Sequence, residues 1–540
     1  MIRLSAFIKF SQISQNRINL RFCVIIILIF SQRSLLFGQL NIPLNNEVME
    51  RLEPSLMRKD PNFFSFLKPY DQVKLKNEIN LDSLLSFDSK ERRKTWFGRK
   101  FLQESFLKVD SSEFTLKVDP LFNFVSGKEV GNNQQLIINT RGIRIQGSLG
   151  KTIGFESSLY ENQAFFPMLT DSFINKRKIA PGQGRAKPYH KTGWDFAYSS
   201  ASMGWRAGNH FYLQFATDKL FVGDGYRSLL LSDISSNYPF LRYTIDFKNF
   251  QYTRIIAELT DINYNTLNKD IGKFPAKTAN FHLLSCNLLK SLQISIFEGT
   301  ILKNPDNLGK LHVNYNLISP VPFLDMLNSD NSHTLIGLNL KWTVDKSFQV
   351  YNQWVFDNLA KKPQGYPSGT TNYGIQAGLK YFNVLKIRNL NLQFEFNLVK
   401  PNTYLQIDST LAYTNFSQPL AHPLGENFAE TIFILSYHYK RLFIEYNGEY
   451  AIYSKNEKVI FHQEEILLLG KNPEKNFLTS PLTKLTNQSA YISYKINPST
   501  NSSINIGMNW RNEQSPSLNR ASKYFYISFS TNLTNIYSDF

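Results

Sequence analysis

The segment Phe221–Asp233, FVGDGYRSLLLSD, brings together residue types that could support chemistry. Two glycines flank Asp224, Arg227 follows, and three leucines precede the closing acid. These residues could form a phosphate cradle, a sugar-binding loop, or a tight turn with its own salt bridge. A phosphate cradle needs glycine amides directed at the anion and a helix that starts immediately behind them. The stretch after Gly225 is too short and too apolar to begin such a helix, which disfavours the first alternative.

The rest of the sequence lacks the common catalytic and metal-binding motifs. It contains no G-x-S-x-G elbow, no G-x-x-x-x-G-K-[ST] phosphate loop and no H-E-x-x-H zinc motif. The eight histidines are scattered, and none has a second histidine or a cysteine at ligand spacing. His438 alternates within a predicted strand and is expected to be a polar interior or girdle residue. We therefore predict no enzyme, no cofactor and no metal site, and a membrane-embedded hydrolase is the least favoured alternative.

The elements that position these residues follow a predicted export signal. The apolar run Phe22–Phe30, FCVIIILIF, comes after four basic residues, and no acidic residue occurs before Glu47. A basic region, a short apolar core and a small residue at the boundary are typical of a secretory signal peptide. The run is too short to span a bilayer, which needs about 20 residues. We predict cleavage near Gly38, so that residues 1–38 form the signal peptide.

Composition narrows the class of the exported chain. The net charge is +17, but the 60 basic residues are spread along the chain, which disfavours a nucleic-acid partner and suits anionic lipid or polysaccharide. Cys23 lies in the predicted signal, so Cys286 is left alone and no intrachain disulfide is expected. The chain also contains 44 Phe and 27 Tyr. These features leave a large soluble all-β protein or an outer-membrane β-barrel.

Alternation along the chain favours the barrel. In 391–400, NLQFEFNLVK, apolar residues alternate with Gln393, Glu395 and Asn397. The predicted strands approach the nine to eleven residues of a tilted membrane strand, whereas soluble strands average about five or six. Charges in mid-strand suit a wet or ion-paired barrel interior; they include Arg254, Glu258, Glu395, Glu445 and Glu449. We predict an all-β, antiparallel transmembrane barrel of about 18 strands.

The predicted organisation has three parts. Residues 1–38 are the signal, 39–113 a small helical segment in the periplasm or in the lumen as a plug, and 114–540 the barrel. The segment 89–106, SKERRKTWFGRKFLQESF, is predicted as a helix that either caps the periplasmic mouth or lies on anionic lipid. Strands are predicted over 404–414 and over 523–534, among others. Long connections are assigned to the cell exterior, namely 165–193, 217–239, 261–278, 301–331 and 456–485.

Two stretches read as compact, folded loops. They are 223–242, GDGYRSLLLSDISSNYPFLR, and 418–430, QPLAHPLGENFAE. A loop that carries leucines must bury them, so we predict that Leu229–Leu231 anchor the first loop against the barrel wall. We expect Arg227 to pair with Asp224 or Asp233, and favour this structural role over direct ligand contact. The candidate polysaccharide and lumen-loop residues are Asp224, Tyr226, Arg227, Asp233, Arg242, His422, Glu426 and Glu430.

These stretches also carry a family resemblance. Residues 221–243 and 418–430, together with 99–129 and 139–167, resemble the RemB-like gliding-motility outer-membrane proteins and, more distantly, the Wzi-like capsule-assembly proteins. The resemblance runs from about residue 96 to the C-terminus. It implies an outer-membrane barrel with a helical N-terminal element and a non-catalytic role at the cell surface, in gliding, in polysaccharide attachment, or both.

The predicted membrane barrel implies outer-membrane lipid and the barrel-assembly machinery that inserts the chain as partners. Surface polysaccharide and gliding or secretion machinery are the further predicted partners. An outer-membrane diffusion channel or export pore is the alternative function.

Overall fold

The computed structural model describes most of the chain after the predicted signal. The described residues are 41–57, 63–85, 93–131, 135–150, 152–262, 274, 276–302, 332–357, 372–406, 409–454, 477–478, 481–537 and 539. The predicted signal peptide lies outside them, and so does most of the predicted loops 261–278, 301–331 and 456–485. In the described part, no helix is long and apolar enough to cross a membrane.

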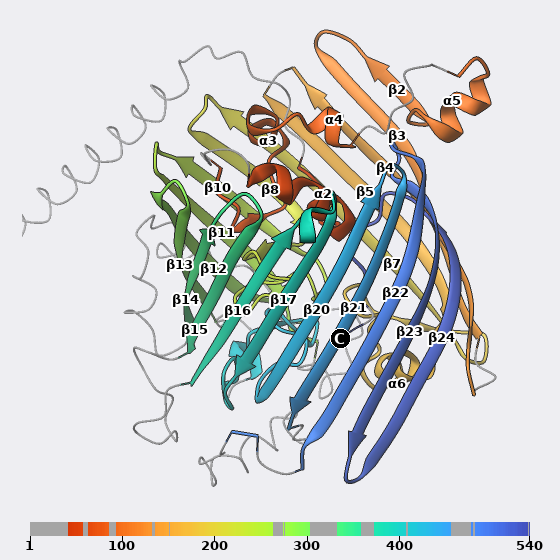
Figure 1. The fold of residues 1–540 in the computed structure, drawn as a ribbon, viewed down its shortest axis with the longest axis vertical. Coiled ribbons are helices and arrows are strands. Elements are labelled where there is room, and N and C mark those ends of the chain that lie inside the picture. Colours follow the sequence, from red (N-terminus) through yellow and green to blue (C-terminus); the bar gives the residue numbers. More distant parts are fainter. Residues whose placement is uncertain are drawn as a thin grey trace, which may run out of the picture.

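Within the described residues, 18 antiparallel strands close into one barrel (Figure 1). Each strand pairs with the next along the chain, and the last pairs with the first. The strands are β3 (Phe114–Glu129), β4 (Gln135–Leu149), β5 (Ile153–Phe165), β7 (Gly193–Ala207), β8 (Phe211–Asp218), β10 (Tyr238–Asp246), β11 (Phe250–Thr260), β12 (Ala276–Leu289), β13 (Leu292–Leu302), β14 (Ser332–Thr343), β15 (Phe348–Asp357), β16 (Asn372–Phe382), β17 (Leu390–Val399), β20 (Phe428–Tyr439), β21 (Leu442–Tyr453), β22 (Thr483–Asn497), β23 (Ser502–Ser515) and β24 (Leu518–Ser530). The predicted fold class is confirmed.

Shorter elements lie inside the barrel or on its rims. The helices are α2 (Asn46–Leu56), α3 (Gln72–Glu78), α4 (Leu81–Leu85), α5 (Trp96–Leu102) and α6 (Met168–Arg177), with 3-10 turns η3 (Val384–Lys386) and η4 (Ser409–Leu411). The short strands are β1 (Leu67–Lys68), β2 (Leu107–Asp110), β6 (Lys187–Tyr189), β9 (Phe221–Val222), β18 (Thr414–Asn415) and β19 (Gln418–Pro419).

The two faces of the wall differ as the alternation predicts. In β17, Phe394 and Phe396 are 44% and 37% exposed on the outside, whereas Glu395 and Asn397, which alternate with them, are fully buried. Side chains alternate between the two faces of a strand, so every second residue meets lipid. The exterior face of β17 is therefore apolar and the middle of its interior face is polar, as in a membrane-spanning barrel.

The two ends of the barrel differ in the length of their connections. At one end the strands are joined by short turns, such as Lys440-Arg441 between β20 and β21; we call this the short-turn end. It lies at the top of Figure 1, where α2 to α5 gather, and α6 lies at the opposite, long-loop end. In outer-membrane barrels the short turns face the periplasm and the long loops face the exterior.

Three segments fill the lumen. They are the N-terminal segment that contains α2, the loop of residues 219–237 between β8 and β10 (the lumen loop), and the C-terminal tail of residues 531–537 and 539. Leu229–Leu231 of the lumen loop are fully buried in the largest apolar cluster, together with residues of the wall. The predicted burial of these leucines against the wall is confirmed.

Two strand predictions, 404–414 and 523–534, are wrong. Of this segment, the described residues 404–406 and 409–413 lie in a loop with the 3-10 turn η4, because the rings of Tyr404 and Tyr413 stack 6.0 Å apart and their hydroxyls bond the lumen loop. The final strand ends at Ser530 and not near 534. Leu533 turns inward instead and packs against a buried cluster of Leu121, Tyr160 and Tyr198.

Candidate functional site

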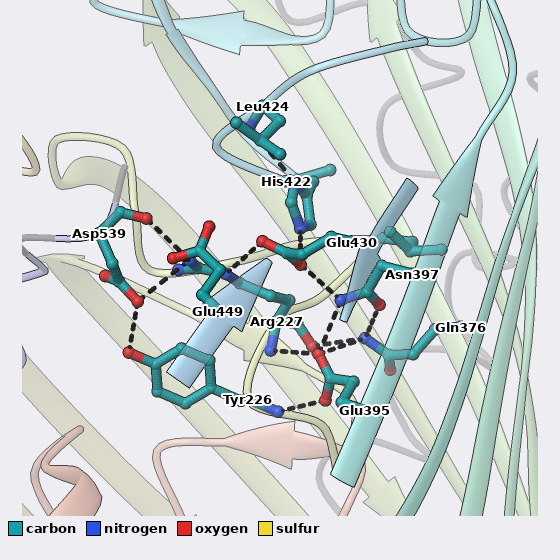
Figure 2. Close-up of polar contacts among 12 residues, drawn as sticks. Tyr226, Arg227, Gln376, Glu395, Asn397, His422, Leu424, Glu430, Glu449 and Asp539 are labelled. Atoms are coloured by element: carbon teal, nitrogen blue, oxygen red, sulfur yellow. Dashed lines mark hydrogen bonds and ion pairs between the residues drawn. The ribbon is translucent and has the colours of Figure 1, made fainter. Parts of the chain in front are cut away.

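Arg227 lies in a buried polar network inside the barrel (Figure 2). Its Nη2 atom lies 3.0 Å from Oδ2 of Asp539 and 3.6 Å from Oε2 of Glu449, and its Nε atom lies 3.6 Å from Oε1 of Glu430. These carboxylates come from the C-terminal tail, β21 and β20. A buried charge without a partner costs several kcal/mol, so the three acids keep the arginine in the lumen.

The glycine turn before Arg227 binds a carboxylate of the barrel wall. The amides of Tyr226 and Arg227 donate to the two carboxylate oxygens of Glu395, at 2.7 and 3.0 Å. A Cβ atom on Gly225 would lie 2.6 Å from Oε2 of Glu395, so this close approach requires glycine. Gly223 has a φ of +130°, which also favours glycine. The turn is thus an anion-binding turn whose anion is a side chain of the same protein.

Further donors complete the Glu395 site. Tyr351 donates its hydroxyl to Oε2 at 2.7 Å, and Gln376 and Asn397 donate side-chain amides to Oε1 at 3.3 and 3.0 Å. The same Asn397 amide lies 2.8 Å from Oε2 of Glu430. Glu395 and Glu430 therefore belong to one continuous network that joins β15, β16, β17 and β20 to the lumen loop.

His422 holds the other side of Glu430. The Leu424 amide donates to Nδ1 of His422 at 3.2 Å, which leaves the ring proton on Nε2, and Nε2 lies 2.7 Å from Oε2 of Glu430. The ring stacks on Phe428 at 4.1 Å. Burial lowers the pKa of His422, against the opposing effect of Glu430. The imidazole is therefore neutral and donates one hydrogen bond to the carboxylate.

The predicted pairing of Arg227 with Asp224 or Asp233 is wrong. Asp224 accepts a hydrogen bond from Ser65 of the N-terminal segment at 2.8 Å. Asp233 accepts one from the Tyr537 hydroxyl of the tail, also at 2.8 Å. Asp224 thus bonds the N-terminal segment and Asp233 bonds the tail. The arginine faces Glu430 and Glu449 of the wall and Asp539 of the tail instead.

Of the eight predicted candidates, four meet in the network and four do not. Those that meet are Tyr226, Arg227, His422 and Glu430. Asp224 and Asp233 flank the network, and Glu426 lines a pocket above it. Arg242 on β10 lies apart, with its guanidinium 5.0 Å from the ring of Tyr212.

Three residues of the network, Glu395, Glu449 and Asp539, are not among the predicted candidates. The first two carried a signal, because both are charges on the polar face of a predicted strand. Asp539 carried none, since nothing in the sequence indicates that the tail folds back into the lumen.

A pocket opens above the network at the long-loop end, and we call it the outer pocket. Its volume is about 220 Å³. It is bounded by α6, by the loop between β17 and β20, and by the tail. Aromatic and charged side chains on its lining include Phe173, Arg177, Tyr404, Tyr413, Glu426, Tyr453, Arg511 and Tyr537.

The lumen loop sets the shape of this pocket. Tyr404 and Tyr413 donate their hydroxyls to the carbonyls of Leu229 and Leu230, each at 2.7 Å. These bonds anchor the phenol ends of both side chains, whose rings line the pocket. On α6 the Arg177 guanidinium lies 4.6 Å from the centre of the Phe173 ring and donates to the Ser417 carbonyl at 3.2 Å.

Ion pairs hold α2 across the short-turn end of the lumen. Lys495 of β22 lies 3.0 Å from a carboxylate oxygen of Glu47, and Lys380 of β16 lies 2.7 Å from one of Glu53. The backbone N–H of Asn46 donates to the side-chain oxygen Oδ1 of Asn535 in the tail at 2.9 Å. The two chain ends therefore bind each other as well as the wall.

Comparisons with known proteins bear on the fold. No family model and no curated protein matches the chain. Among solved structures it is similar to Wzi, an outer-membrane protein involved in group 1 capsule assembly in Escherichia coli and a carbohydrate-binding β-barrel. The TM-score is 0.55 at 10% identity, over 92% of this chain and 100% of Wzi. The chain has a Wzi-like barrel fold.

Two further solved structures align with lower TM-scores. OprD of Pseudomonas aeruginosa aligns at 8% identity with a TM-score of 0.42, over 77% of this chain and 96% of OprD. OccAB2 of Acinetobacter baumannii aligns at 8% identity with a TM-score of 0.44, over 78% and 99% of the two chains. At 10% identity the likeness to Wzi shows the fold alone. The resemblance to RemB-like gliding proteins stays a prediction.

Proposed function

We propose that this protein is a non-catalytic outer-membrane barrel that binds a surface polysaccharide in its outer pocket. The outer pocket itself carries the proposal. It lies at the long-loop end, it is concave, and aromatic side chains line it beside the cation of Arg177. Such sites typically combine apolar and aromatic walls with a few polar groups that fix the ligand. Aromatic rings pack against the apolar faces of sugars, and a cation attracts acidic sugars.

The filled lumen supports binding over transport. The lumen loop, α2 and the tail occupy the interior. Charged groups of several strands bind the lumen loop and α2, and Asp539 of the tail pairs with Arg227 of the lumen loop. An open pore would have to release at least one of these segments, and release would leave buried charges without partners. The diffusion channel or export pore is the alternative that this proposal replaces.

The biological setting rests on resemblance. Wzi is a carbohydrate-binding barrel involved in capsule assembly. The RemB-like resemblance points to gliding on surfaces. A polysaccharide-binding barrel would serve either role, by retaining a capsule or by coupling secreted polysaccharide to movement. We propose polysaccharide attachment as the activity and gliding as one process that uses it.

A gene deletion tests the proposal. We expect the deletion strain to shed its surface polysaccharide into the medium, and a spreading defect if gliding depends on it. Capsule retention and colony spreading are measured in the same strain, with the wild-type gene restored on a plasmid as the control. Normal retention together with normal spreading would overturn the proposal. Steady conductance of the purified protein in planar bilayers would favour the channel instead.

A further inference from the structure

Helix α5 carries aromatic side chains that belong to none of the buried apolar clusters of the described residues. Trp96, Phe97 and Phe101 are 57%, 69% and 49% exposed, and none of the helix residues is buried. Phe97 and Phe101 stack with their ring centres 5.6 Å apart, and Trp96 meets Phe106 edge-on at 6.4 Å. A contiguous exposed apolar patch marks a surface that binds something.

The helix is fixed to the rim of the barrel. Asn497, at the end of β22, donates its side-chain amide to the carbonyls of Lys100 and Glu104 at 3.1 and 3.0 Å. The hydroxyl of Ser499 donates to the Gln103 carbonyl at 2.6 Å. Figure 1 shows α5 outside the barrel at the short-turn end, beside β2. Its aromatic side chains therefore have a defined height relative to the strands.

This position adds to a belt of apolar side chains at the short-turn end. Elsewhere on the short-turn end, strand ends and turns expose residues such as Phe247, Phe250, Leu289, Trp342, Leu385 and Tyr439. Membrane barrels carry such aromatic girdles where the wall meets the head groups. The turn between β22 and β23, Pro498-Ser499-Thr500-Asn501, offers only a proline and three polar residues. Helix α5 is bonded to Asn497 and Ser499 at that turn and adds three exposed aromatic side chains beside Tyr494 and Ile504 of the flanking strands.

Strand β2 extends the lipid-facing surface toward the helix. Leu107 and Val109 pair with Val118 and Leu116 of β3, and directly opposite residues lie on the same face of a sheet. Both are exposed, at 44% and 46%. Leu116 and Val118 share the outward parity of Phe124, which is 41% exposed on the barrel exterior. The patch is thus continuous with the surface that meets lipid.

The charge around the patch identifies the kind of lipid. The stretch 93–100, RKTWFGRK, contains four basic residues and no acidic one. Within it Arg99 and Lys100 lie 3.7 and 3.4 Å from carboxylate oxygens of Glu104. Basic side chains beside aromatic ones are typical of segments that lie at an anionic membrane surface.

We propose that α5 and β2 form a membrane anchor that rests in the head-group region of the periplasmic leaflet, against anionic phospholipid. The anchor adds to the apolar belt at the polar turn between β22 and β23, and it sets the depth and tilt of the barrel. It is separate from the outer pocket, which lies at the opposite end.

Depth-dependent quenching tests the anchor. The protein with Cys286→Ser is given one cysteine, labelled with an environment-sensitive dye, and placed in vesicles of phosphatidylethanolamine and phosphatidylglycerol. The labelled site is Phe97→Cys. Ile506→Cys, exposed on the lipid-facing belt, is the control for the acyl-chain region. Ser83→Cys, exposed on α4 at the short-turn end, is the control for water. Heat-modifiable gel mobility checks that each variant is folded.

We expect spin labels on the lipid head groups to quench the dye at position 97 strongly. The dye at position 506 should respond to labels deep in the acyl chains, and the dye at position 83 to neither. Replacing phosphatidylglycerol by phosphatidylcholine should weaken the quenching at position 97.

If the dye at position 97 behaves like that at position 83, the patch faces water as a docking site for a periplasmic protein, and the proposal is overturned. Polysaccharide binding by Phe97→Asp is expected to stay normal, so the two proposals fail independently.

Discussion

The backbone amide of Arg227 donates to Glu395 at 3.0 Å, while the guanidinium of the same residue faces three other carboxylates. One residue of the lumen loop therefore satisfies acids on β17, β20, β21 and the C-terminal tail. The Gly-Asp-Gly turn has the chemistry of an anion site, but the wall of the barrel supplies the anion. This arrangement makes the loop a structural support under the outer pocket.

Glu395→Gln should destabilise the barrel. The substitution removes the charge that the amides of Tyr226 and Arg227 and the hydroxyl of Tyr351 all bind. A hydrogen bond to a charged group contributes about 1.5–3 kcal/mol, so we expect the free energy of unfolding to fall by roughly that amount. Urea unfolding in detergent measures it, and Glu113→Gln, at an exposed turn, is the control. Equal stability of the two variants would contradict the role of Glu395.

Arg227→Ala should destabilise the folded protein more than Glu395→Gln does. The substitution leaves Glu430, Glu449 and Asp539 facing one another without a cation. Removing one partner of a buried ion pair typically costs about 3–5 kcal/mol. We expect a low yield of folded protein by heat-modifiable mobility, and partial recovery when Glu449→Gln is added. A variant that folds at normal yield but loses polysaccharide binding would instead assign Arg227 to ligand contact.

Gly337→Ala tests how the lumen loop packs on β14. A Cβ atom at this position would lie 2.3 Å from Cδ2 of Leu230, which is fully buried and has no space to move. Overpacking of a core costs about 1–3 kcal/mol. Gly448→Ala on β21 is the matched control, since its nearest neighbour is the tip of the Tyr446 side chain at 3.0 Å. The loop does not pack as described if both variants melt at the same temperature.

Stability should fall as the pH drops below about 6.5, the ordinary pKa of histidine. Burial lowers the pKa of His422 in the folded protein, so the neutral ring stabilises the fold above that pH. Below it, the unfolded chain takes up a proton that the folded chain resists, and this contribution is lost. Unfolding at pH 7.5 and pH 5 measures the effect. His422→Gln should show a smaller dependence on pH than His210→Gln, whose ring is exposed.

Much of the wall could be predicted, because lipid outside and polar groups inside impose a two-residue period. Phe394 and Glu395 show this: the sequence places them on opposite faces, and the structure agrees. The contents of the lumen could not be predicted in the same way. Asp539 meets Arg227 across 312 positions of the chain, and such contacts leave no local pattern. The segment 404–414 has strand-like residues, yet its tyrosines bond the lumen loop rather than a neighbouring strand.

Arg177 provides the most direct test of polysaccharide binding in the outer pocket. The measurement is calorimetric titration of the surface polysaccharide of the source cell into the purified protein, with Arg177→Ala and Lys176→Ala compared side by side. Lys176 is an exposed cation on the same helix and does not line the pocket. Loss of a hydrogen bond from a charged group, about 1.5–3 kcal/mol, corresponds to at least roughly tenfold in affinity. We expect binding by the wild type and Lys176→Ala, and binding at least about tenfold weaker by Arg177→Ala. Absence of binding by the folded wild type, or equal affinities for all three proteins, would contradict polysaccharide binding in the outer pocket.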